Sequence, residues 1–103
     1  MAKKKIIGKQ KKKNAWIIVK RRGHLELYDE KKAYGSCYFA CRSAHLSEQE
    51  SESICEKVCK AVANRLQSKR EVSSDEIFNI VAEELEKHNE DASFMYKTHR
   101  DIS

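Results

Sequence analysis

Hydrophobic and polar positions change their spacing part-way along the chain. Between residues 15 and 32, an apolar run over residues 16–19 ends in Lys20 and Arg21, reaches Gly23 and returns through two leucines at alternate positions. Aromatic and β-branched residues that alternate with polar ones on both sides of a glycine are typical of a β-hairpin. The pattern therefore predicts a hairpin with two cations at its bend.

After the hairpin the apolar residues recur at intervals of three and four, which is the spacing of an amphipathic helix. Asp29 is suited to cap the first of these helices, over residues 30–43. Ser47 followed by Glu50 forms the pattern of a capping box, which marks the start of a second helix of about five turns. We expect that helix to end near Gln67.

The remaining third of the chain predicts a short strand and two more helices. The strand is expected over residues 69–72, and Ser73 with Glu76 forms a second capping-box pattern before the third helix. A last helix is expected over residues 91–100, and the acidic run at 83–86 is interpreted as a solvated helix face. The whole order predicts an α+β fold, in which a three-stranded sheet packs on a cluster of four helices.

Length and composition restrict the class of protein. A chain of 103 residues is large enough for one modest core and one folded domain. Charged residues make up 36% of the chain and the mean hydropathy is -0.78. Because neither an apolar run of about 20 residues nor the pattern of a secretory signal occurs, we expect a cytoplasmic protein with no membrane partner.

The net charge of +5 comes from the first residues of the chain. Residues 1–14 contain seven lysines and no acid, so the rest of the chain holds 14 basic and 16 acidic residues. A segment with so few apolar side chains cannot offset the entropy of ordering, and we expect a flexible tail before a folded domain at 15–103. Two interpretations of the tail stay open: contact with nucleic acid through phosphate neutralisation, and a purely solubilising role.

Four cysteines occur in two pairs with a spacing of four residues, which places each pair on one helix face. The pairs are Cys37 with Cys41 and Cys55 with Cys59. Two such faces could present four thiolates to zinc or form two disulfides. All four positions also fall on the apolar stripes, and free cysteine behaves as a small buried hydrophobe. We interpret the cysteines as core residues and assign no metal ligands.

Candidate chemistry gathers at the hairpin. Lys20, Arg21 and Lys32 would meet at one end of the sheet, close to the positive end of a helix dipole, which suits a polyphosphate. Signatures of catalysis are missing: the sequence contains no phosphate loop, no zinc-protease histidine pair and no nucleophile with a recognisable base. The sequence thus favours a binding protein over an enzyme.

The hairpin residues resemble the ATP-cone, a regulatory adenine-nucleotide-binding domain of ribonucleotide reductases and of the repressor of their genes. The matching positions in the hairpin region are Ile18, Lys20, Arg21, Gly23, Glu26, Tyr28, Asp29 and Lys32. Further matches are Val72, Ser74, Glu76 and Ile77 before the third helix, and Tyr96 and Arg100 in the last. Arg22 and Phe78 stand where the family usually has an aspartate and a polar residue. The resemblance implies a four-helix cluster capped by a three-stranded sheet.

The resemblance also implies a ligand and a set of contacts. The ligand is ATP or dATP with Mg²⁺, and Lys20, Arg21 and Lys32 would hold its phosphates. Glu26 and Asp29 would orient Lys32 and accept from the ribose or stand near the metal. Ile18 would form a wall for the adenine. Ser74 and Arg100 are further contact candidates.

A free-standing module of this family would sense adenine nucleotides without catalysing a reaction. Its output would pass to a regulated partner such as a ribonucleotide reductase, to its own oligomeric assembly, or to the lysine-rich tail. The alternative function is that of a small basic nucleic-acid-binding protein or transcriptional regulator, in which the tail and the hairpin grip phosphates. A structural adaptor without a ligand is the third interpretation.

Overall fold

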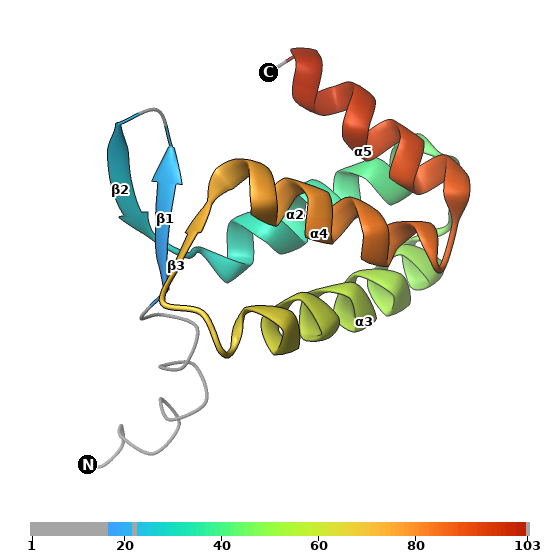
Figure 1. Cartoon of the computed structure of the whole chain (residues 1–103). Coiled ribbons are helices and arrows are strands. Elements are labelled where there is room, and N and C mark those ends of the chain that lie inside the picture. The colour runs from blue at the N-terminus through green and yellow to red at the C-terminus, as the bar shows by residue number, and fades with distance from the viewer. Residues whose placement is uncertain (1–16, 22, 103) are drawn as a thin grey trace, which may run out of the picture.

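A computed structural model describes residues 17–21 and 23–102 of the chain. Within them lie three strands and four helices, in the order β1 (Ile18–Arg21), β2 (His24–Leu27), α2 (Glu30–Ser43), α3 (Glu48–Leu66), β3 (Glu71–Ser73), α4 (Ser74–Glu86) and α5 (Glu90–Ile102). Figure 1 shows the sheet at one end of the molecule and the helices beside it. The predicted α+β fold is confirmed. The predicted tail, residues 1–14, lies outside the described residues.

The sheet has the strand order β2-β1-β3, with β2 antiparallel and β3 parallel to β1. Gly23 adopts a φ of 86° between β1 and β2, a left-handed conformation that glycine reaches without steric cost. The predicted hairpin is therefore confirmed, with Lys20 and Arg21 as the last residues of β1 beside the turn. Lys20 and Arg21 are paired within β1, opposite Leu25 and His24, because the strand continues up to the turn.

Side-chain caps begin the first three helices where the sequence predicts them. The Asp29 carboxylate accepts hydrogen bonds from the backbone N–H groups of Lys31 and Lys32, at 3.1 and 3.2 Å. Ser47 and Glu50 form a reciprocal capping box. Ser73 accepts from the Glu76 N–H at 3.0 Å. The Glu76 carboxylate forms an ion pair with Lys69 at 3.0 Å, so the predicted second box has only its serine half.

The third strand begins two residues later than predicted. The Lys69 N–H donates to the Leu66 carbonyl and so closes the end of α3. Arg70 accepts a hydrogen bond from the Ile18 N–H, and regular pairing then runs from Glu71 to Ser73. Residues 69 and 70 thus connect α3 to the sheet instead of belonging to the strand.

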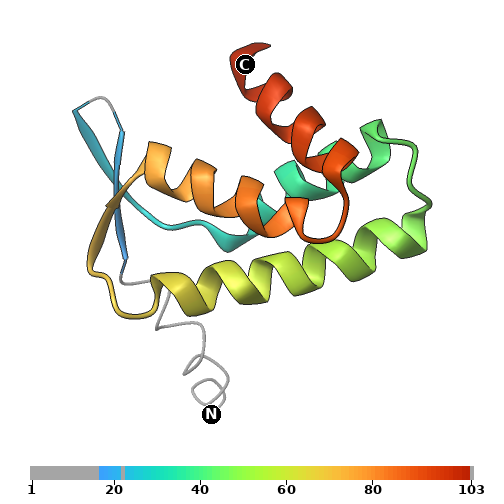
Figure 2. The same ribbon diagram turned by 45° about the vertical axis from the view of Figure 1, so that its right-hand side comes forward.

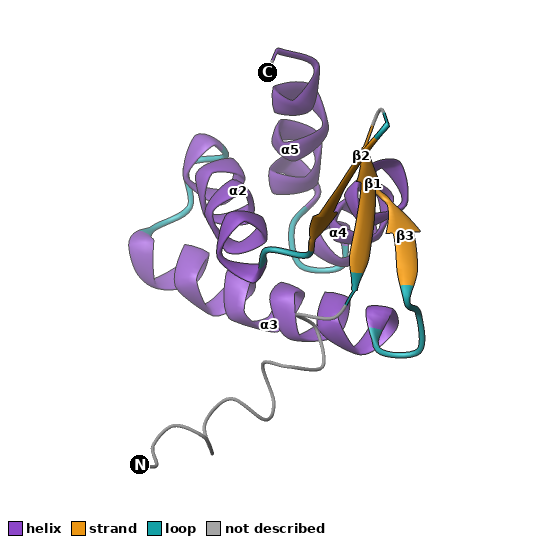
Figure 3. Ribbon diagram, turned by 90° about the vertical axis from the view of Figure 1, so that its left-hand side faces the viewer, coloured by secondary structure: helices purple, strands orange, loops and turns teal. Residues whose placement is uncertain are grey.

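The helices pack around one core that continues to the sheet. Figure 2 shows α3 along the base of the molecule, with α4 above it and α5 rising from the end of α4. Figure 3 shows the three strands side by side at the end of this helical layer. Apolar side chains of the sheet and the helices fill the core, among them Ile17, Val19, Val58, Val62, Leu66, Val72, Val81 and Leu85. None of the described helices is long and apolar enough to cross a membrane.

One part of the predicted solvated acidic face is buried. Glu84 is only 6% exposed, whereas Glu83 and Glu86 are exposed. Its carboxylate accepts hydrogen bonds from Arg65 of α3 at 3.1 Å and from Lys87 at 3.2 Å. The prediction was wrong for Glu84 because Arg65, one of the two cations that hold it, comes from a different helix.

Candidate functional site

A cleft of about 280 Å³ lies beside the sheet, where β1, β2, α2, α4 and α5 contribute side chains to its walls. These elements border the space between the hairpin and α5 in Figure 1. Charged, hydroxyl-bearing and aromatic residues line it, together with aliphatic ones. They include Glu26, Asp29, Lys32, Ser74, Phe78 and Tyr96.

The register of the hairpin decides which strand residues face the cleft. Val19 lies opposite Glu26 in the antiparallel pair and next to Val72 in the parallel pair. Paired residues share one face of a sheet, and successive residues along a strand alternate between faces. Val19 and Glu26 both line the cleft, so this face of the sheet is the one turned toward the helices.

Two helix beginnings border the cleft at its polar side. Asp29 caps α2 and Lys32 lies in its first turn, while Ser74 is the first residue of α4. Helix N-termini carry partial positive charge and favour anions. Among the described side chains that line the cleft, Lys32 is the only lysine or arginine, and it is exposed. This side of the cleft is therefore suited to a negatively charged group.

Aromatic side chains form another wall. The rings of Phe78 in α4 and Tyr96 in α5 are stacked, with centroids 4.9 Å apart and planes at 18°. His99, one turn after Tyr96, also lines the cleft, and its ring centroid lies 4.5 Å from that of Phe39. Flat apolar surfaces of this kind suit a planar aromatic ligand.

Tyr28 contributes a polar atom to the same cleft. Its side chain is buried, and its hydroxyl has no hydrogen-bond partner among the described residues. Burial is the main cause that raises the pKa of Tyr28 well above its usual range, so this phenol stays protonated. A buried hydroxyl without a partner costs free energy, and a ligand atom that reached it would relieve that cost.

Four of the eight residues predicted for the site line the cleft: Glu26, Asp29, Lys32 and Ser74. Ile18 and Lys20 do not line it, because they alternate with Val19 and lie on the other face of β1. Lys20 there forms an ion pair with Glu71 at 3.1 Å. The side chains of Arg21 and Arg100 lie outside the described part of the structure.

The cleft also contains residues that the predicted site did not include. They are Val19, Leu27, Tyr28, Ala33, Ser36, Ile77, Phe78, Val81, Tyr96 and His99. Helical spacing offered a signal for some of them: Phe78 and Val81 are three residues apart, as are Tyr96 and His99, so each pair shares a helix face. The sequence pattern could not show that α5 turns these side chains toward α4.

Comparison with known proteins gives one match, to a family model described as ATP cone domain, over residues 17–100. The matched segment contains every element of the described fold except the last residues of α5. No curated protein and no solved structure matches the chain.

Proposed function

Because this chain belongs to the ATP-cone family, we propose that it is a non-catalytic regulatory module that binds ATP or dATP in the cleft between the sheet and α5. Membership of the family indicates a nucleotide-binding, regulatory role. The assignment of that role to this cleft, and of individual contacts within it, is our proposal.

The observation that carries the proposal is the division of the cleft into an anion-favouring side and an aromatic side. A nucleotide has the same division, with phosphates at one end and a planar base at the other. The cleft volume of about 280 Å³ lies near the lower end of the usual range for ligand sites, roughly 300–1,000 Å³. A nucleoside would therefore fill the cleft while its phosphates extend along the surface.

Lys32 is assigned to the phosphates because it is an exposed cation in the first turn of α2. Ser74 at the start of α4 would donate its hydroxyl to a phosphate oxygen. Glu26 and Asp29 would accept from the ribose hydroxyls or hold Mg²⁺, since carboxylates are ligands that this ion prefers. These four side chains already share the cleft.

The base is assigned to the wall formed by Phe78 and Tyr96. Ile18 would reach a nucleotide only from the outer face of the sheet, so its contact with adenine is the less favoured arrangement. Lys20 and Arg21 remain proposed phosphate contacts, and Arg100 remains a further contact candidate. Lys20 would have to leave Glu71 to serve in this way.

The output of nucleotide binding would pass to another molecule. A regulated protein such as a ribonucleotide reductase, or a second copy of the chain, would respond to the changed surface around the cleft. The hairpin and α5 both form walls of the cleft, so we propose that these two segments transmit the effect of nucleotide binding to the partner.

Thermal unfolding in the presence of nucleotides tests the proposal. A ligand that binds only the folded state stabilises it by about 2.7 kcal/mol at a hundredfold excess over Kd, which is a clear rise in Tm for a small domain. ATP or dATP with Mg²⁺ should produce this rise. GTP should produce a smaller one, because it offers the same phosphates and a different base.

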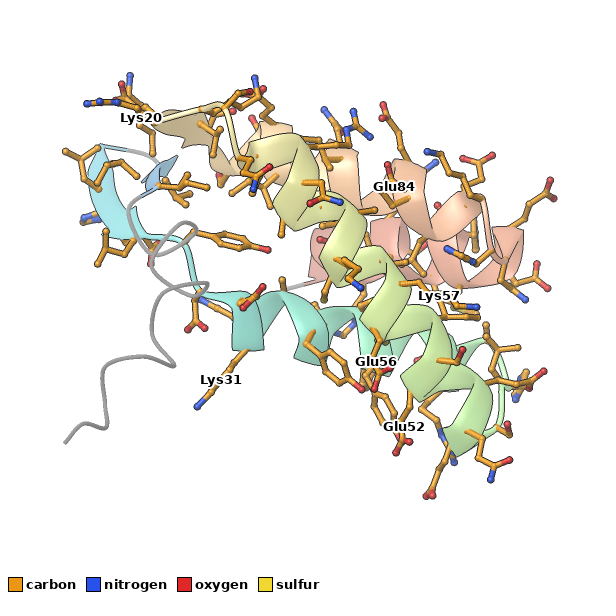
Figure 4. All side chains as sticks on the ribbon, turned by 90° about the horizontal axis from the view of Figure 1, so that it is seen from below. Lys20, Lys31, Glu52, Glu56, Lys57 and Glu84 are labelled. Carbon is orange, nitrogen blue, oxygen red and sulfur yellow. The ribbon has the colours of Figure 1, made fainter. Side chains whose placement is uncertain are left out.

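Lys32→Ala should remove most of the ATP-dependent rise in Tm without unfolding the protein, since a charge-assisted contact is lost. Lys57→Ala is the matched control: Lys57 is an exposed lysine on α3, outside the cleft and away from Lys20 at the sheet end (Figure 4). Lys20→Ala should have a smaller effect than Lys32→Ala. The proposal fails if no purine nucleotide changes Tm, or if Lys32→Ala responds like the control.

A further inference from the structure

Three cysteine sulfur atoms meet in the interior, on the side of α2 that packs against α3. Cys37 and Cys41 come from α2 and Cys55 comes from α3, and their sulfur atoms all lie within 4.8 Å of one another. All three residues are fully buried. Cys59, one turn after Cys55, is only partly buried and lies outside this group, which we call the sulfur cluster.

The geometry of the sulfur cluster is close to that of a metal centre. A tetrahedral ion with metal–sulfur bonds of about 2.3 Å holds its sulfur atoms about 3.8 Å apart. The cluster would have to contract by at most about 1 Å, which side-chain rotation can supply. The pair within α2 is poorly placed for a disulfide, because Cβ atoms four residues apart in a helix are about 5–6 Å apart and a disulfide needs about 3.5–4.5 Å.

The thiols of the sulfur cluster are close enough to influence one another. Thiol donors at Cys37 and Cys55 lower the pKa of Cys41. The same interaction with Cys41 is the main cause that raises the pKa of Cys37. A cation that replaces the thiol protons would find three sulfur ligands already converged.

We propose that Cys37, Cys41 and Cys55 bind a single thiophilic d¹⁰ metal ion, Zn²⁺ or Cu⁺, that joins α2 to α3. Thiolates select these soft ions over Mg²⁺ or Ca²⁺. Binding deprotonates the thiols and releases their protons to solvent, so affinity falls as the pH falls. The site is separate from the cleft, since none of the three cysteines lines it, and it does not depend on the proposed nucleotide function.

Metal titration of the reduced full-length protein tests this inference. After incubation with Zn²⁺ under anaerobic conditions and removal of unbound ion, elemental analysis should find about one zinc per chain, as one three-thiolate site requires. Co²⁺ should give a sulfur-to-cobalt charge-transfer absorbance that Zn²⁺ displaces. A parallel titration with Cu⁺ against a chromophoric copper(I) chelator shows which of the two ions binds more tightly.

Cys55→Ser should abolish the cobalt absorbance, whereas Cys59→Ser, on the same helix one turn away, should retain it. If Cys55→Ser fails to fold by circular dichroism, Cys55→Ala and the wild-type stoichiometry provide the test. Absence of metal and of charge-transfer absorbance in the folded wild type would overturn the proposal. So would an equal loss of the cobalt absorbance in Cys59→Ser.

Discussion

The two sides of α2 differ in their exposure to solvent and in their chemical character. Its first turn, with Asp29 and Lys32, is exposed and borders the cleft, while Cys37 and Cys41 on its inner side are fully buried. The cleft is lined by charged and aromatic side chains, whereas the interior beside α3 is closed and mostly apolar. The helix α2 thus lies between the candidate binding cleft and the hydrophobic core. Mutations on its two sides should therefore have separable effects on nucleotide binding and on stability.

The largest effect is expected in the closed interior. Leu66 at the end of α3 is 0% exposed, and Leu66→Ala should lower the free energy of unfolding by about 3 kcal/mol, because it removes buried methyl groups and leaves a cavity. Urea denaturation measures this change. ATP should still raise the Tm of the variant, since no part of the cleft is altered.

Leu25→Ala is the control for this experiment. Leu25 is 68% exposed on β2 and does not line the cleft, so its truncation should change the free energy of unfolding by no more than about 0.5 kcal/mol. A loss at Leu25 as large as that at Leu66 would show that the sheet and the interior under α3 are not distinct in stability.

Local signals in the sequence were enough for most of the fold. Asp29, Ser47 and Ser73 cap helices through hydrogen bonds to residues two or three positions away, so the sequence contains both partners of each cap. The turn at Gly23 depends only on a glycine between two apolar strands. These interactions are short in range, which is why the elements and their order could be predicted.

Contacts between distant segments were not predictable in the same way. Lys20 lies opposite Leu25 in the hairpin, but the partner that takes its charge is Glu71, on a strand some fifty residues later. The stacking of Phe78 on Tyr96 requires the angle between α4 and α5. The sequence placed the cysteines on apolar stripes but could not show that three of the four sulfur atoms converge. Some of the polar residues that line the cleft could therefore be predicted from the sequence, whereas the aromatic residues that line it could not.

An intermediate effect is expected at Glu84, whose carboxylate connects α3 and α4 in the interior layer. Burial raises the pKa of Glu84, but hydrogen bonds from Arg65 and Lys87 outweigh it and leave the pKa below its usual range. A carboxylate with a lowered folded-state pKa stabilises the fold above its unfolded pKa, and this stability is lost as the pH falls through the folded value.

Glu84→Gln should therefore cost about 1.5 kcal/mol at neutral pH, at the lower end for a charged hydrogen bond because Arg65 and Lys87 are exposed to solvent. The wild type should lose this advantage in acid, so the two proteins should converge in stability as the pH falls below about 4. Urea denaturation across a pH series measures the difference. Glu86→Gln, on the exposed face of α4, should follow the wild type at every pH; a constant difference between Glu84→Gln and wild type would rule out the ion pair as its source.

The smallest effect is expected at Tyr28, where the interior meets the cleft. The ring is buried, but its hydroxyl has no partner among the described residues, so Tyr28→Phe removes an unsatisfied polar atom and keeps the packing. We expect the free protein to become more stable by about 1 kcal/mol in urea denaturation. If the hydroxyl binds the nucleotide, the ATP-dependent rise in Tm should become smaller in the same variant.

Phe78→Leu, which thins the aromatic wall and leaves Tyr28 unchanged, should weaken the nucleotide response without the gain in stability. Loss of stability in Tyr28→Phe without ATP would mean that the hydroxyl is already paired in solution, and Tyr28 would then have no unsatisfied donor to offer a nucleotide.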